Sequence, residues 1–168
     1  MSLHALAPFC TWLAATPVSQ TIQGVGWVIP AVQTVHILCV AAVMVSVLLI
    51  DLRLLGVAAR DMTIDATLTR FLPGLWWPLP ILLATGSTLI VAEPERALEN
   101  PVFVLKMILL LGGSLLTLAC RWLLRNRPGF WDHTAKHRVL ARIFAVASLL
   151  TWVGIVFAGR WIAYVQGS

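Results

Sequence analysis

Four long apolar runs, separated by short polar segments, dominate the hydrophobic pattern of the chain. The first covers about residues 27–50, and the others cover roughly 71–92, 101–124 and 141–165. Each run holds about twenty residues or more, which is the length an α-helix needs to cross the hydrocarbon core of a bilayer. The pattern predicts an all-α fold, in which a single integral membrane domain over residues 1–168 forms a transmembrane four-helix bundle.

The segment before the first run has a different character, because residues 1–26 contain no Lys, Arg, Asp or Glu. Its aromatic residues Phe9 and Trp12 indicate a short N-terminal interfacial helix. A straight helix over 19–50 would measure about 48 Å, which exceeds the thickness of the bilayer core. We therefore expect this helix to project beyond the core or to bend near Gly24.

Composition supports a membrane protein and argues against a nucleic-acid-binding one. The chain is 60% hydrophobic and 11% charged, whereas soluble domains are about 45–50% apolar. The net charge of +5 would permit contact with nucleic acid. However, the basic residues gather at the ends of the apolar runs, where membrane topology explains them. We expect lipid, not nucleic acid, as the main surrounding partner.

The basic residues also predict an orientation. Nine of them lie in two of the connecting segments or at the adjoining ends of the apolar runs: Arg53, Arg60, Arg70, Arg121, Arg125, Arg127, Lys136, Arg138 and Arg142. The segment between the second and third runs holds only Arg96, beside three glutamates. By the positive-inside rule the two basic segments are cytoplasmic. This predicts a multi-pass protein of a bacterial inner (plasma) membrane with both termini in the periplasm.

Three residues that are or can be positively charged lie in the outer halves of the apolar runs. With this orientation, His36 lies roughly 10–14 Å below the outer end of the first span, and Lys106 and Arg160 each lie about 7 Å from the outer ends of theirs. They come from three different helices, and the outer half of the second span adds Thr85 and Thr88. Ionisable groups in lipid are costly, so their meeting at one depth indicates a site.

Haem b matches the chemistry of this group. An imidazole such as that of His36 binds iron, and the cationic Lys106 and Arg160 can neutralise propionates. Gln33, one turn before His36, is placed to orient the ring. A quinone needs fewer polar contacts and fits less well. Two simpler roles stay open: Lys106 and Arg160 can extend to lipid phosphates, and His36 can hydrogen-bond a neighbouring helix.

Copper is a further alternative, because His36 and Cys39 are one turn apart and methionine sulfur is a soft ligand. Met44 and Met107 supply such sulfur. Met44 lies more than two turns from His36, so the spacing does not bring these groups together along one helix.

Several segments resemble a family of bacterial four-span integral membrane proteins of unknown function. They are VHIL, DLRLLG and NPVFVLKM, together with the final AGRWIAY, and the resemblance covers most of the chain. More distantly, the pair His36 and Lys106 is similar to functional positions of membrane protoporphyrinogen oxidases that carry haem b. There the histidine is taken as a haem ligand. The copper-resistance D-type membrane proteins resemble the chain to a comparable degree.

The resemblance has a limit that bears on the ligand set. The predicted spans contain no second histidine, so haem held by two histidines, as in cytochrome b561, is not expected. A sixth ligand would have to be Met107, Lys106, water or a group from another subunit.

Together these observations predict a haem b-binding integral membrane protein. It would work in electron transfer, or in oxidation of a membrane-associated substrate, at a site in the outer leaflet. His36 would be the metal ligand, with Lys106, Arg160, Gln33 and Met107 around the cofactor. The alternative is a non-catalytic membrane subunit or a copper-handling membrane protein. Whether the chain is an enzyme, whether it meets a membrane or periplasmic redox partner, and whether it forms a homo-oligomer stay open.

Overall fold

The described part of the computed structural model is all-helical, and four of its helical stretches are long and apolar enough to cross a membrane. It describes residues 6–58, 60–127, 129–131, 134–162 and 164–165. The helices are α1 (Ala7–Ala14), α2 (Pro17–Gly24), α3 (Val28–Leu54), α4 (Ile64–Phe71), α5 (Pro73–Trp76), α6 (Pro78–Ala92), α7 (Pro94–Leu98), α8 (Pro101–Asn126) and α9 (Ala135–Trp161). The predicted fold class is confirmed.

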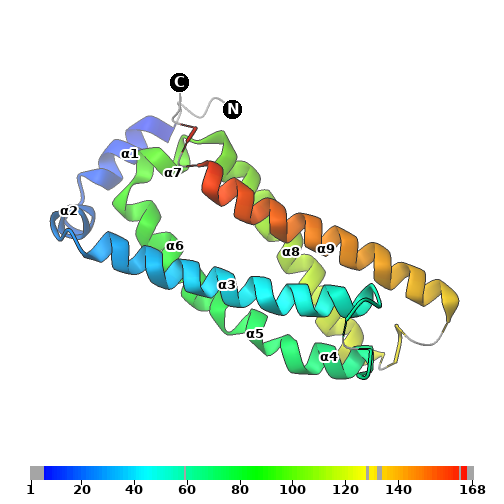
Figure 1. Ribbon diagram of the computed structural model, residues 1–168. Coiled ribbons are helices and arrows are strands. Elements are labelled where there is room, and N and C mark those ends of the chain that lie inside the picture. Colours follow the sequence, from blue (N-terminus) through cyan, green and yellow to red (C-terminus); the bar gives the residue numbers. More distant parts are fainter. Residues whose placement is uncertain (1–5, 59, 128, 132–133, 163, 166–168) are drawn as a thin grey trace.

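The spanning elements are α3, the α4–α5–α6 series, α8 and α9 (Figure 1). The second of them covers Ile64–Ala92 and is longer than the predicted run. Pro73 and Pro78 stand at the starts of α5 and α6. A proline lacks the backbone N–H that would bond into the preceding turn, which explains why this stretch is divided into three helices. The predicted break near Gly24 is also present, since α2 ends there and α3 begins separately at Val28.

Two ends of the bundle can be distinguished in Figure 1. The end that carries α1, α2, α7 and the last turn of α9 is called the terminal end below. The end that carries α4, the connection after α3 and the connection after α8 is called the basic end. This second end holds the basic segments that the sequence predicts to be cytoplasmic.

The N-terminal helices α1 and α2 pack over the last turn of α6 and over α7. The buried Ser19 hydroxyl donates to the carbonyl of Val91 at 2.8 Å, and Gln23 donates to that of Ala92 at 2.7 Å. Cys10 is completely buried against α7, and burial, together with nearby Glu99 and Glu95, raises the pKa of its thiol. These contacts satisfy carbonyl groups that the end of α6 leaves without helical partners.

The interior is packed most tightly near the basic end. One core cluster lies there around Ile50, Leu68 and Trp131, and a second lies at mid-height around Val47 and Trp152. Toward the terminal end the packing thins. None of the described residues is buried in three stretches there: 28–42 of α3, 79–91 of α6 and 101–112 of α8. The half of the bundle predicted to hold a site is therefore the more open half.

Pairwise packing gives the arrangement of the four spans. Helix α3 packs against α6 and α9, and α9 packs against α8. Within the described residues, α6 and α8 do not pack closely on each other. The four spans therefore pack in the order α6, α3, α9 and α8.

Candidate functional site

His36 projects from α3 toward α6 and is half-buried between the two helices. Its Nδ1 atom lies 2.8 Å from the Thr85 hydroxyl oxygen. Gly86 makes room for the ring, because a Cβ atom at Gly86 would lie 3.6 Å from Cε1 of His36. Thr85 and the adjacent Gly86 of α6 therefore position the imidazole.

The hydrogen bond also indicates which ring nitrogen carries the proton. Thr85 has a single hydroxyl hydrogen, and its oxygen lies 2.7 Å from the carbonyl of Ile81 one turn earlier. If that hydrogen is donated to Ile81, then Nδ1 of His36 must be the donor to Thr85. A neutral imidazole protonated at Nδ1 keeps a lone pair at Nε2. Such a nitrogen can bind a metal, with Thr85 in the orienting role seen around metal-bound histidines.

Lys106 is half-buried where α8 packs against α9. A Cβ atom at Gly159 would lie 3.7 Å from its Nζ atom, so the lack of a side chain at Gly159 provides space for the ammonium group. Among the described residues it has no hydrogen-bond or ion-pair partner. Like His36 on α3, it lies in the terminal half of its span. An ammonium group placed this way favours an anionic ligand or lipid phosphate.

The other predicted site residues are less closely placed. Arg160 follows Gly159 directly but is exposed, and its guanidinium contacts Tyr164, with 3.1 Å between Nη2 and the hydroxyl oxygen. Gln33 is exposed and has no hydrogen-bond partner in the described part of the chain. Met107 is 36% exposed, next to Lys106. The structure thus brings His36, Thr85 and Lys106 to one region and leaves Arg160, Gln33 and Met107 at its margin.

The acids of the terminal end do not neutralise Lys106. Glu93 pairs with Arg96 at 2.9 Å, the single ion pair within the described residues. Glu99 lies beside Cys10. In the same described residues, no three His, Cys, Asp or Glu side chains come together as a metal site. The surroundings of His36 are compatible with a metal held by one protein nitrogen, as in a haem. The described residues do not form a closed metal site of protein ligands alone.

One polar residue differs from its expectation. The predicted first span covers about residues 27–50, so Asp51 is expected just beyond its inner end. Helix α3 continues to Leu54, and Asp51 within it is only 1% exposed. Asp51 therefore belongs to the helix, because the apolar run ends before the helix does. The available signal was an acid between the apolar neighbours Ile50 and Leu52.

The four long apolar helices define a multi-pass helical membrane protein, and its candidate polar residues lie in one half of the bundle. The chain matches a family of unknown function, DUF6644, over residues 11–165, and it belongs to that family. This agrees with the resemblance to a four-span family of unknown function. Neither a search of curated proteins nor one of solved structures found a match. The likeness to haem-carrying oxidases and to copper-resistance proteins stays a prediction.

Proposed function

We propose that the protein binds haem b in the terminal half of its bundle and works in electron transfer or in oxidation of a membrane-associated substrate. The observation that carries this proposal is the hydrogen bond between Nδ1 of His36 and Thr85, which leaves Nε2 as a candidate iron ligand. The haem would supply one-electron redox chemistry when bound.

The packing of the terminal half supports a large apolar ligand there. The three stretches 28–42, 79–91 and 101–112 have no buried side chain among the described residues, although they carry the polar site. A planar macrocycle offers extensive apolar surface to such helices, as cofactors in helix bundles do. Lys106, with Arg160 at the margin, would bind the propionate groups.

The same geometry suggests how the site would bind the iron. His36 would be the single protein ligand from α3, since the described part of this half contains no other histidine. Met107 would lie among the residues around the cofactor. We therefore propose the terminal half, by its charge pattern the periplasmic one, as the place of electron exchange with a membrane or periplasmic partner.

An absorption spectrum tests the proposal. The protein is expressed with ample haem, purified in detergent and measured for a Soret band together with its metal content. We expect one haem per chain, loss of most of it in His36→Ala, and full retention in His137→Ala, which removes a histidine near the start of α9. Protein that is folded but free of haem, or His36→Ala with wild-type haem content, would contradict the proposal.

The same samples address the alternative. Copper in place of haem, lost in Cys39→Ala as well as in His36→Ala, would indicate a copper-handling protein. A third outcome is that the protein contains neither haem nor copper, and that His36→Ala, Lys106→Ala and Arg160→Ala change only its thermal stability. In that case the polar residues act in helix packing and lipid contact, as in a non-catalytic subunit.

A further inference from the structure

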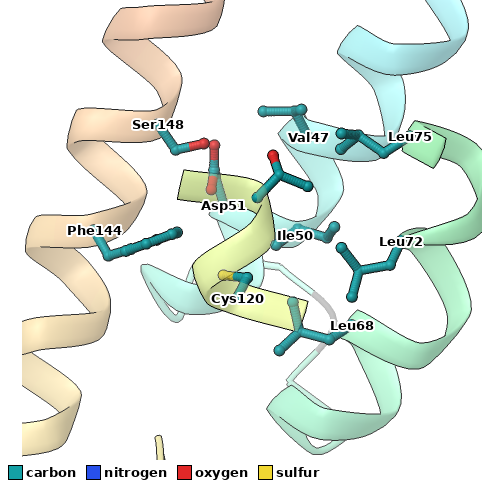
Figure 2. Close-up of a pocket in the computed structure, with 10 residues that line it drawn as sticks. Val47, Ile50, Asp51, Leu68, Leu72, Leu75, Cys120, Phe144 and Ser148 are labelled. Carbon is teal, nitrogen blue, oxygen red and sulfur yellow. The ribbon is translucent and has the colours of Figure 1, made fainter. Parts of the chain in front are cut away.

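Asp51 is the one acid that is buried among the described residues, and it lies in the half of the bundle opposite His36. It is on α3, close to the basic end, and is 1% exposed. Figure 2 shows its carboxyl group between α9 and the part of α8 that carries Cys120. This position is separate from the candidate haem site.

Among the described residues, no cation lines the cavity beside Asp51. From α9 the Ser148 hydroxyl points at the carboxyl group and is its hydrogen-bonding neighbour (Figure 2). From α8 the facing groups are the Thr117 hydroxyl and the Cys120 thiol. The series α4–α5 presents only apolar side chains, which are Leu68, Leu72 and Leu75. The carboxyl group therefore faces hydroxyls, one thiol and hydrocarbon.

Hydrogen-bond accounting favours a neutral acid in this place. The Thr117 hydroxyl is already engaged with the carbonyl of Gly113 at 2.9 Å. Ser148 can donate only one hydrogen bond, and Oδ2 of Asp51 is buried with no partner among the described residues. A carboxylate needs donors at both oxygens, and an unpaired buried charge is costly. A protonated carboxyl group removes the charge and adds a donor of its own.

The cavity beside Asp51 is large enough for one water molecule. It leaves about 20 Å³ for the centre of a water, whereas one water needs about 10–15 Å³. Its polar lining is formed by Asp51, Thr117 and Ser148, which gives a water the two to four partners it requires. Arg53, two residues further along α3, donates to the carbonyl of Met62 at 2.8 Å and leaves Asp51 without its charge.

We propose that Asp51 is a proton-binding site, where the carboxyl group takes up and releases a proton through a water molecule held in this cavity. On uptake, an O–H bond of a hydronium ion breaks, a carboxyl O–H bond forms and water remains. Electrons are not exchanged, and no further reactant is needed. The proton comes from the aqueous side at the basic end, to which the end of α3 leads.

Difference infrared spectroscopy of the full-length protein in lipid nanodiscs tests this inference. Spectra are recorded between about pH 5 and pH 9, a range that a carboxyl group in apolar surroundings can reach. We expect the C=O stretch of a protonated, buried carboxyl group at low pH and its loss at high pH. It should be absent in Asp51→Asn and unchanged in Asp61→Asn, which alters an exposed acid.

Two further variants keep the test decisive if Asp51→Asn does not fold. Ser148→Ala should shift the frequency of the same band, because it removes the hydroxyl at the carboxyl group, and Asp51→Glu should keep a titrating band. No titrating band, or a band that persists in folded Asp51→Asn, would overturn the proposal. So would a band that disappears on adding Na⁺ at constant pH, which would indicate a cation site instead.

Discussion

At the scale of single residues, the pairing of His36 with Thr85 is the most informative contact in the bundle. Sequence placed a histidine in an apolar span and suggested Gln33 as its orienting neighbour, but Gln33 is exposed and without a partner among the described residues. The partner comes from α6 at 2.8 Å. A neighbour 49 positions away cannot be predicted from spacing along one helix. The sequence does predict that a histidine within an apolar span needs a polar partner.

Removing the Thr85 hydroxyl should therefore leave the His36 imidazole in place but no longer fix its orientation. If haem is bound as proposed, Thr85→Val should weaken it about 10–100-fold, the usual effect of losing the group that orients a metal-bound histidine. Haem titration of the purified apoprotein measures this change.

Thr88→Val is the matched control. The Thr88 hydroxyl, one turn later on α6, donates to its own helix at the carbonyl of Ala84 and does not contact His36. Equal affinities for Thr85→Val, Thr88→Val and the wild type would show that the His36–Thr85 contact does not position the ligand.

At the scale of elements, the crossing of α8 and α9 depends on a glycine. The run Gly112–Gly113–Ser114 predicts the close approach of another helix, because small residues allow it. At Gly113 helix α9 does come this close, because a Cβ atom there would lie 3.2 Å from Cε2 of Trp152 and 3.4 Å from Cγ2 of Thr151. Gly112, by contrast, has open space where its Cβ would be. Which of two adjacent glycines faces the neighbour depends on helix rotation in the bundle.

The two glycines offer a paired experiment. Gly113→Val should lower the free energy of unfolding by about 1–3 kcal/mol, since its methyl groups would push into the buried Trp152. Gly112→Val should change it little, because its side chain enters open space. Unfolding in mixed micelles with a denaturing detergent provides the comparison. If both variants lose the same stability, valine itself, and not the helix crossing, is the cause.

At the scale of the whole molecule, the bundle is tight at one end and open at the other. Core clusters around Trp131 and Trp152 hold the basic end and the middle. At the terminal end the short helices α1 and α2 and the buried Asn100, which donates to the carbonyl of Ile162 at 3.2 Å, tie the helix ends together. Between them lies the half with Lys106 and His36. This division separates the proposed redox site from the proposed proton site along the bundle.

The charge pattern leads to a prediction for the whole chain. Nine basic residues flank the spans on one side against one on the other. Alkaline phosphatase fused after Ser168 should therefore be active, because it folds in the periplasm, and a fluorescent protein fused there should be dark. Fusions in the segment 127–134 should give the opposite result. A fluorescent C-terminal fusion would reverse the orientation and place the His36 site on the cytoplasmic side.

Sequence by itself determined the class of fold, the number of spans and the candidate polar residues His36, Lys106 and Arg160. These follow from run length and from the cost of placing charge in lipid, which are local properties. Only the tertiary structure decided which of them meet. It joined His36 to Thr85, left Arg160 at the margin and buried Asp51 beside Ser148. Such contacts depend on the rotation and crossing of helices distant in sequence, because packing between helices, not periodicity along one, sets which faces oppose each other.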